Sequence, residues 1–228
     1  MQKVPNHVTT NETKPVVLAM LKAPRGGEVK TRLARDLGAE TAVAIYRRLV
    51  ERQLSAIPRE WSVEVHFTPA DAQREMRAWL GSRPSYHPQI GNDLGERLIH
   101  AIAGTFGRGA RTSIVIGGDC PDLDDPTLRE AANALATVDV VLGPAADGGY
   151  YLIGLRAPQP QLFRGITWSS ATVLPSTLAR IEESGLSYVT LPLKEDVDDL
   201  ASWRRAETRL RSMTPDAAEA SPSSPGDL

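Results

Sequence analysis

The chain has 228 residues, 41% hydrophobic and 24% charged, and its 26 basic and 28 acidic side chains leave a net charge of −2. This length fits one domain or two small ones, and the balanced charge gives no global attraction to nucleic acid or to an anionic membrane. A single cysteine, Cys120, excludes an internal disulfide and any multi-cysteine metal site. No apolar run approaches the ~20 residues of a membrane span, and the polar first 14 residues lack the apolar core of a signal peptide. We therefore expect a soluble, cytoplasmic protein; nothing in the sequence indicates its oligomeric state.

Short apolar runs alternate with amphipathic segments along the chain. A flexible arm at 1–14 precedes the domain, which we place at 15–211, and a Pro/Ser/Ala/Asp-rich tail at 212–228 is typical of disorder. In chain order we expect a strand at 16–21, a helix within 38–57, a strand at 62–68, helices at 71–80 and 94–106, a strand at 113–116, a helix capped by Asp125 and running to about 136, strands at 138–142 and 150–155, a helix at 173–184, a strand at 187–193 and a final helix after 199. Residues 81–92 and 163–170 follow neither periodicity and are expected to be irregular connections.

Strands that alternate with helices of this length imply an α/β fold, with a mostly parallel mixed sheet in a three-layer α/β/α arrangement. Right-handed crossovers then bring the loops that follow the strands to one edge of the sheet. The unusual loops of this sequence all follow strands, so we expect them to converge.

The first unusual loop, KAPRGGEVKTRLA at 22–34, holds two adjacent glycines among four cations. Small residues let a backbone approach a ligand closely, and cations with helix N-terminal amides suit a di- or triphosphate. The spacing is neither GxxxxGK[ST] nor GxGxxG, and a solvated surface turn is the alternative. The candidate nucleotide-binding residues here are Lys22, Ala23, Pro24, Gly26, Gly27, Lys30 and Arg32.

Asp119 ends the buried strand 113–116, after two glycines and before Cys120-Pro121. A buried charge there needs a partner, which is either an arginine or turn amide, or a metal ion. Acids at Asp196 and Asp198 face the same way if the chain is extended, although Asp198 is equally suited to be the N-cap of the final helix. Because Mg²⁺ or Mn²⁺ takes few protein oxygens, Asp119 with one of these two acids suffices.

Two further segments carry polar candidates. In the turn GPAADGG, Asp147, Gly148 and Gly149 are candidate residues for binding the acceptor or the sugar, and Asp147 is also a candidate base; the alternative is that the acid only forms the turn. In GNDLGERL, Asp93 and Arg97 are candidate nucleotide-binding residues, with a helix cap and a surface ion pair as the alternatives. None of the four histidines lies in a glycine-rich loop, so Cys120 is interpreted as a packed residue rather than a nucleophile.

The order and spacing of five segments, KAPRGGEVKTRLA, GNDLGERL, GGDCPDL, GPAADGGYYLIGL and EDVDDLASW, resembles a bacterial family of small GT-A-fold proteins over about residues 16–210. Its members are usually assigned as glycosyltransferases, and relatives are linked with arsenosugar or radical-SAM-associated pathways. The chain is more distantly similar to the nucleotidylyltransferases that load guanylyl groups onto phospholactate or molybdopterin. The resemblance implies a GT-A fold of the nucleotide-diphospho-sugar transferase type.

The same resemblance implies roles for the candidate residues. It implies nucleotide phosphates bound by Lys22, Gly26, Gly27, Lys30 and Arg32. Asp119 would hold the metal, completed by Asp196 or Asp198. One departure is that Asp119-Cys-Pro-Asp122 replaces the Asp-x-Asp motif of typical GT-A glycosyltransferases, which favours the nucleotidylyltransferase branch.

Three functions follow as hypotheses. The leading one is a Mg²⁺-dependent transferase that moves the sugar of a nucleotide sugar to a small-molecule acceptor, with Asp119, Lys30 and Asp147 as catalytic residues. The alternative is a nucleotidylyltransferase in which an acceptor phosphate attacks a nucleoside triphosphate and pyrophosphate leaves. The third is a non-catalytic protein that binds nucleotide through residues 22–32.

Overall fold

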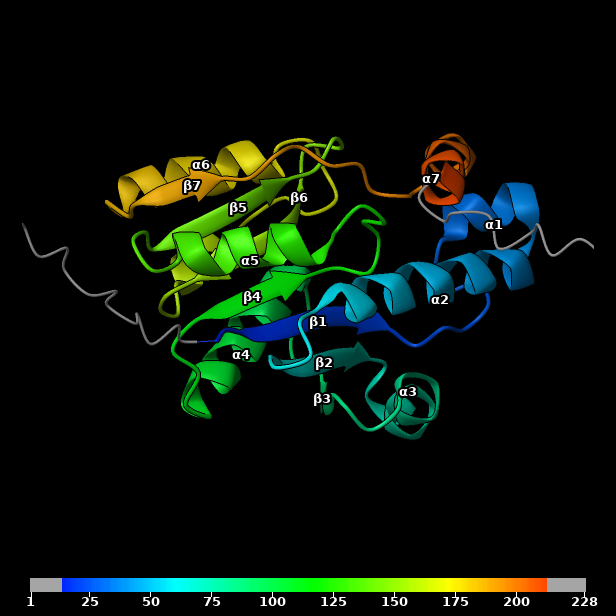
Figure 1. Ribbon diagram of the computed structural model, residues 1–228, viewed down its shortest axis with the longest axis horizontal. Coiled ribbons are helices and arrows are strands. Elements are labelled where there is room, and N and C mark those ends of the chain that lie inside the picture. Colours follow the sequence, from blue (N-terminus) through cyan, green and yellow to red (C-terminus); the bar gives the residue numbers. More distant parts are fainter. Residues whose placement is uncertain (1–13, 213–228) are drawn as a thin grey trace, which may run out of the picture.

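The computed structural model describes residues 14–212, which fold around one seven-stranded sheet (Figure 1). The strands are β1 (Val16–Lys22), β2 (Ser62–Thr68), β3 (Ser85–Pro88), β4 (Ser113–Ile116), β5 (Val140–Pro144), β6 (Tyr150–Leu155) and β7 (Tyr188–Thr190). They lie in the order β3-β2-β1-β4-β6-β5-β7, and β6 runs antiparallel to β4 and β5 while the remaining neighbours are parallel. The predicted α/β class with a mostly parallel mixed sheet is therefore confirmed.

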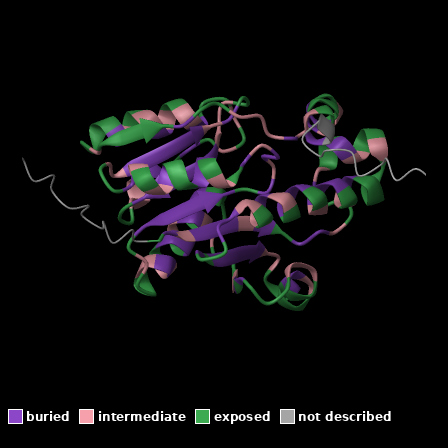
Figure 2. Cartoon of the chain, in the orientation of Figure 1, coloured by how far each residue is buried: buried purple, intermediate pink, exposed green. Residues whose placement is uncertain are grey.

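Helices cover both faces of this sheet. They are α1 (Thr31–Leu37), α2 (Ala39–Ala56), α3 (Gln73–Leu80), α4 (Leu94–Gly107), α5 (Asp125–Ala134), α6 (Val173–Glu183) and α7 (Leu200–Ser212), with 3₁₀ turns at Ala70–Ala72 and Pro160–Leu162. One core cluster packs α2, α3 and α5 against the face seen in Figure 1, and a second packs α4 and α6 against the opposite face. The sheet is thus the middle of three layers, and Figure 2 shows its central strands as mostly buried, whereas the edge strand β7 is exposed.

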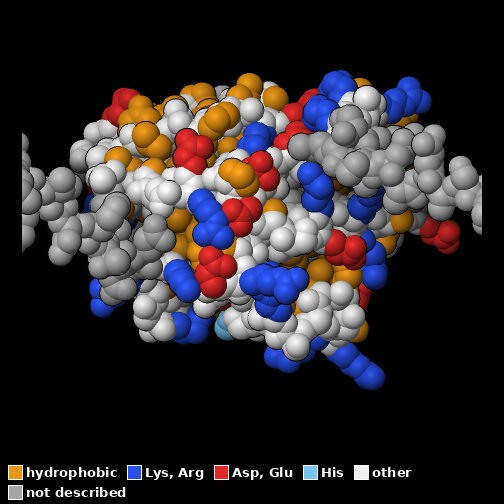
Figure 3. Space-filling model, viewed as in Figure 1, with side chains coloured by type: hydrophobic (Ala, Val, Ile, Leu, Met, Phe, Trp, Pro, Cys, Tyr) orange, Lys and Arg blue, Asp and Glu red, His pale blue; other side chains and the backbone are white. Residues whose placement is uncertain are grey.

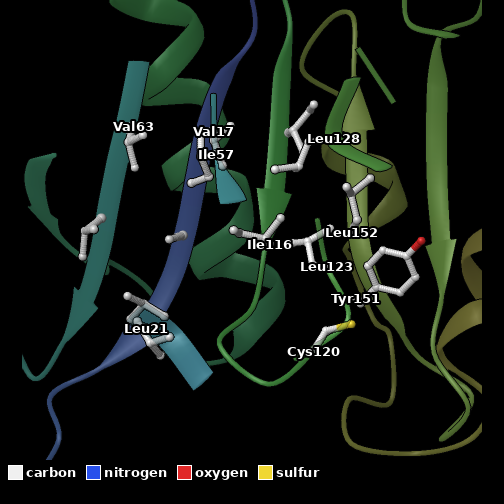
Figure 4. Close-up of a cluster of buried hydrophobic side chains, with 14 of the residues drawn as sticks. Val17, Leu21, Ile57, Val63, Ile116, Cys120, Leu123, Leu128, Tyr151 and Leu152 are labelled. Carbon is white, nitrogen blue, oxygen red and sulfur yellow. The ribbon is translucent and has the colours of Figure 1, made fainter. Parts of the chain in front are cut away.

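The continuous apolar run of β1 is explained by burial on both faces. Val17, Ala19 and Leu21 belong to the core under α2, whereas Leu18 belongs to the core under α4. A strand that alternated between apolar and polar residues would leave one of these two cores without contacts. Figure 4 shows part of the first core, in which Cys120 packs among apolar side chains.

Four local expectations were wrong. Residues 81–92 contain a short parallel edge strand, β3. The sequence did not predict it, because Pro84 before it and Pro88 at its end are equally typical of an irregular connection. The loop expected to run to Ala34 ends earlier, because α1 begins at Thr31. The cap of α5 is Asp124, whose Oδ1 accepts a hydrogen bond from Thr127 N at 3.1 Å, rather than Asp125. The strand expected at 187–193 is limited to the three residues of β7.

A third, smaller core lies at the end of the molecule where α7 packs beside α1 (Figure 1). It contains Leu33 of α1, Leu49 of α2, Trp203 of α7 and Val197 of the segment before α7. Through this core, a segment from late in the sequence is fixed beside the loop that follows the first strand.

The described residues form no large region of one charge on the face shown in Figure 3. On the face shown in Figure 3, acidic and basic side chains are interspersed, as the small net charge suggests. No helix among residues 14–212 is long and apolar enough to cross a membrane. The predicted flexible arm at 1–14 and disordered tail at 212–228 lie almost entirely outside the described residues.

Candidate functional site

A cavity of about 710 Å³ opens at the edge of the sheet where the loops after β1, β4, β5 and β7 meet. Open α/β sheets place their ligands at this edge, beyond the carboxyl ends of the parallel strands. The charged side chains that line the cavity are Lys22, Glu28, Lys30, Arg32, Asp119, Asp147, Asp196 and Asp198. The predicted convergence of these loops is therefore confirmed.

Lys30 lies between two carboxylates of the cavity, those of Asp119 and Asp198. Its ammonium lies 2.7 Å from Asp119 Oδ1 and 3.6 Å from Asp198 Oδ1, and it also donates a hydrogen bond to the carbonyl of Val197. Only 5% of the side chain is exposed. Its backbone is left-handed, with φ of 46°, a conformation that costs a non-glycine residue on the order of 1–2 kcal/mol. The fold thus stabilises an unfavourable backbone to hold this cation between two carboxylates.

Asp119 is positioned by the backbone on both sides of it. A Cβ on the preceding Gly118 would stand 2.9 Å from Val50 Cγ2 on α2, so only glycine fits there. The carbonyl of Asp119 accepts a hydrogen bond from Val197 N at 2.9 Å. This bond ties the end of β4 to the acidic segment, so that Asp119 and Asp198 lie close enough to share Lys30.

Asp196 is the most perturbed acid of the cavity. Its Oδ1 is buried and has no hydrogen-bond partner among the described residues. Burial, and next the neighbouring charges of Asp119 and Asp147, raise its pKa to about 7. A carboxylate in this situation is stabilised by a cation, because a cation removes both the desolvation penalty and the repulsion.

Asp198 and Asp122, two other acids near the metal candidates in sequence, have different surroundings. Asp198 faces the cavity with 40% of its side chain exposed. The alternative role considered for it, capping the final helix, falls to Asp199, whose Oδ1 accepts from Ser202 N at 2.8 Å. Asp122 lies outside the cavity lining and pairs with Arg209 at 3.0 Å.

Several predicted nucleotide-binding residues do not line this cavity, namely Ala23, Pro24, Gly26, Gly27, Asp93 and Arg97, and neither does the predicted acceptor residue Gly148. Asp93 caps α4 by accepting from Glu96 N at 2.8 Å, and Arg97 donates to the carbonyl of Gly91 at 3.0 Å. Arg25, one of the four loop cations, pairs with Glu75 at 3.0 Å and Asp71 at 3.5 Å. The roles proposed for these residues in binding stay predictions.

Sequence reasoning missed most of the apolar part of the lining, namely Met20, Leu94, Leu98, Val115 and Ile153. Trp168 and Tyr150, which the sequence suggests as pocket-wall residues, do line the cavity, together with residues 169–171. In the sequence, the strand residues among them have the same pattern as ordinary core positions, so no local signal separates a cavity wall from a core. Trp168 lies in a segment without periodicity, and its position depends on tertiary packing.

The charge balance of the cavity fits a divalent cation. Five of its charged lining residues are acidic and three are basic, so the lining alone does not favour a polyanion. Among the described residues, no group of three or more potential ligands forms a ready-made metal site. Mg²⁺ does not require one, because it is bound by one or two carboxylates together with water and substrate phosphates. Asp119, the unpartnered Asp196 and the exposed Asp198 are suitable donors.

The sequence matches, over residues 53–170, a family described as an uncharacterised protein conserved in bacteria (DUF2064). The chain belongs to this family. It is 32% identical to a candidate nucleotide-diphospho-sugar transferase from Desulfovibrio desulfuricans G20, whose crystal structure it matches with a TM-score of 0.78 over 89% of this chain and 99% of that one. No curated protein sequence matches it.

More distant structures share the fold at low identity. A CMP:2-keto-3-deoxy-manno-octonic acid synthetase in complex with CTP is 12% identical, with a TM-score of 0.55 over 88% of this chain and 100% of that one. Rv0371c from Mycobacterium tuberculosis H37Rv in complex with manganese is 16% identical, with a TM-score of 0.52 over 85% and 98%. These matches support the GT-A-like fold predicted from the sequence.

Proposed function

We propose that the protein is a transferase that binds a nucleotide sugar with the help of Mg²⁺ or Mn²⁺ and moves the sugar to a small-molecule acceptor. The observation that carries this proposal is the meeting of Lys30, Asp119 and Asp198 in one cavity, with Asp196 unpartnered beside them. The similarity to a candidate nucleotide-diphospho-sugar transferase supports the substrate class. The link to arsenosugar or radical-SAM pathways stays a prediction.

In this proposal the charged lining binds and orients the diphosphate. Lys22, Lys30 and Arg32 would contact its oxygens, and the carboxylates of Asp119 with Asp196 or Asp198 would hold the cation. When bound, the cation neutralises negative charge on the leaving diphosphate. Lys30 adds a positive charge from a site with little water, where a charge acts more strongly than in bulk solvent.

The acceptor side of the cavity is assigned to Asp147. Its Oδ1 accepts from Gly149 N at 2.9 Å, which orients the carboxylate within the turn between β5 and β6. As the acceptor oxygen bonds to the anomeric carbon, the bond from that carbon to the diphosphate breaks. The proton of the acceptor hydroxyl would pass to Asp147, and the nucleoside diphosphate would leave.

A nucleotidylyltransferase is the second candidate. In that reaction, the same loop and cation would hold a nucleoside triphosphate, an acceptor phosphate would attack its α-phosphorus, and pyrophosphate would leave. The fold shared with a synthetase that binds CTP supports this candidate, as does Asp119-Cys-Pro-Asp122 in place of Asp-x-Asp. The two candidates differ in their products.

A thermal-shift panel of nucleoside triphosphates and nucleotide sugars, with and without Mg²⁺ or Mn²⁺, tests both candidates. A ligand at 100 times its Kd stabilises the fold by about 2.7 kcal/mol, which raises Tm by roughly 5–10 °C in a domain of this size. We expect a shift that requires both nucleotide and metal, followed by release of a nucleoside diphosphate rather than pyrophosphate. A metal-independent shift without turnover would instead support a non-catalytic nucleotide-binding protein.

Asp119→Asn tests the proposed metal carboxylate directly. Replacing it keeps the shape of the side chain but removes the charge that faces Lys30 and the cation, so we expect turnover to fall at least about 100-fold. Asp122→Asn is the matched control, because Asp122 pairs with Arg209 outside the cavity. Unchanged turnover in Asp119→Asn would rule out both enzymatic candidates.

Comparing Lys30→Met with Arg25→Met tests which loop cation binds phosphate. Lys30 lines the cavity, whereas Arg25 is engaged by Asp71 and Glu75. We expect the Kd for UDP or GDP with Mn²⁺, measured by calorimetry, to rise at least about tenfold in Lys30→Met and less than about twofold in Arg25→Met. The opposite ranking would move the phosphate site away from Lys30.

A further inference from the structure

Part of the cavity wall is formed by apolar side chains without charge. We define the apolar recess as the part lined by Met20, Leu94, Leu98, Val115, Ile153 and Trp168. These side chains come from β1, α4, β4, β6 and the segment before α6. No phosphate-binding role suits them, so the recess calls for an occupant of different chemistry from the diphosphate.

The recess lies on the α4 face of the sheet. Val115 pairs with Ile153 across β4 and β6, and Leu18 pairs with Val115 across β1 and β4, which puts Met20, two residues further along β1, on the same face. Except for Leu94, which is exposed, the recess residues belong to or pack against the core under α4 and α6. Gly118, just before Asp119, packs against α2 on the opposite face. The charged and apolar parts of the cavity therefore lie toward different layers.

The segment GNDLGERL at the start of α4 builds one wall of the recess. Asp93 begins the helix as its cap, and Leu94 and Leu98 line the cavity one turn apart. A Cβ on Gly95 would stand 2.4 Å from the carbonyl oxygen of Phe163 and 3.0 Å from Trp168 Nε1. Glycine at this position thus lets the segment that carries Trp168 approach α4 and close the recess. This packing accounts for a motif whose polar residues do not line the cavity.

The turn with Asp147 contacts both the segment that follows Trp168 and the segment that precedes Asp196. On one side, Gly148 O accepts from Leu174 N at 2.9 Å, and a Cβ on Gly148 would stand 2.5 Å from Ala171 Cα. On the other side, Ala146 N donates to Lys194 O at 3.0 Å, just before the acidic segment. A molecule whose body fills the recess therefore presents its near end to Asp147.

We propose that the apolar recess binds the uncharged, apolar body of the acceptor and directs its nucleophilic hydroxyl toward Asp147. This inference rests on the proposed function for the identity of the occupant as acceptor. It makes Trp168 and Leu98 determinants of acceptor specificity. A methylene group that moves from water into such a recess strengthens binding about fourfold.

Binding of n-alkyl β-D-glucosides, measured by calorimetry without nucleotide or metal, tests the recess by itself. From methyl to butyl glucoside we expect Kd to fall about fourfold per methylene group. Trp168→Ala should flatten this dependence, and Trp168→Phe should retain most of it, because phenylalanine restores an apolar wall. The melting temperature of each variant, measured alongside, checks that the fold is intact.

Trp79→Ala is the matched control. Trp79 lines a second, smaller cavity of about 250 Å³ that shares no lining residue with the first, and an alkyl chain could also bind there. A chain-length dependence that survives Trp168→Ala or disappears in Trp79→Ala would overturn the proposal, and so would a flat dependence in the unaltered protein. If Trp168→Ala weakens UDP or GDP binding tenfold, the recess holds the nucleotide base and the proposal is likewise overturned. Because no nucleotide is present in the main assay, its result is independent of the nucleotide panel that tests the proposed function.

Discussion

Replacing Asp196 with asparagine should make the protein more stable while removing a candidate metal ligand. Burial, and next repulsion from Asp119 and Asp147, raise the pKa of Asp196 from 3.8 to about 7. A shift of about three units corresponds to roughly 4 kcal/mol of destabilisation when the side chain is ionised. Asparagine at this position removes that destabilisation. Its amide is itself buried with few hydrogen-bond partners, however, which costs on the order of 1–2 kcal/mol. We expect a net gain of about 2 kcal/mol at pH 8, or a Tm higher by roughly 4–8 °C.

The pH dependence of this gain has a definite sign. Because the folded-state pKa is raised, folding takes up a proton between pH 3.8 and about 7, and the unaltered protein loses stability as the pH rises through this window. Near pH 4, where Asp196 is protonated, Asp196→Asn should therefore have no advantage and be about 1–2 kcal/mol less stable, because only the cost of the buried amide remains. Its advantage should reach the full value above pH 7 in calorimetric melts. Asp198→Asn is the matched control and should change stability by less than about 1 kcal/mol, since Asp198 is 40% exposed and close to Lys30. If Asp196→Asn melts at or below the unaltered protein at pH 8, Asp196 is not a destabilising charge and the argument for a cation beside it fails.

Two further tests concern residues outside the charged part of the cavity: a buried ion pair and the glycines of α4. Burial opposes the ionisation of Glu64, but hydrogen bonds from His66, Arg108 and Thr105 outweigh the effect of burial and lower the pKa of Glu64 to about 2. The stability that this carboxylate contributes is therefore present above about pH 4.5 and is lost as the pH falls toward 2. Arg108→Ala should cost about 3 kcal/mol at pH 7 in denaturant melts and weaken this acid dependence, and an unchanged acid profile would contradict the assignment. Gly95→Ala should destabilise by more than about 2 kcal/mol because of the contact with Phe163, whereas Gly107→Ala in the same helix meets nothing within 4 Å and should be neutral or stabilising by up to about 1 kcal/mol. Equal melting temperatures for the two glycine variants would show that α4 does not need the close approach at its start.

The charged side of the site was predictable because its signals are local. The cation-rich loop follows one apolar run, and Asp119 follows another. Once each run is recognised as a strand, both are expected at the edge of the sheet where ligands bind. Lys30, Asp119 and Asp198 were all found in this way, and the structure places them in one cavity. The sequence could not show that Lys30 contacts Asp119, because this distance depends on how the segment before α7 packs against α1.

The apolar side of the site was not predictable for the opposite reason. Val115 and Ile153 differ in no local respect from residues of a closed core, since a cavity arises from atoms that are missing nearby rather than from the residues that remain. Asp93 and Arg97 were interpreted as nucleotide ligands because they are polar residues of the segment GNDLGERL. In the structure, Gly95 is a residue of that motif where a Cβ would clash, because the carbonyl oxygen of Phe163, 68 residues later in the chain, would lie 2.4 Å from it.

The small core around α7 has a consequence for how the protein is made. The loop with Lys30 leaves the ribosome early, but the packing that fixes it involves Trp203, near the end of the described chain. Asp196 and Asp198 are equally late, and Val197 supplies the backbone groups that contact Lys30 and Asp119. A growing chain can therefore form most of the sheet, yet it cannot assemble the charged site until α7 has been synthesised. Nascent chains that stop before this helix should carry every predicted loop cation and still lack a working site.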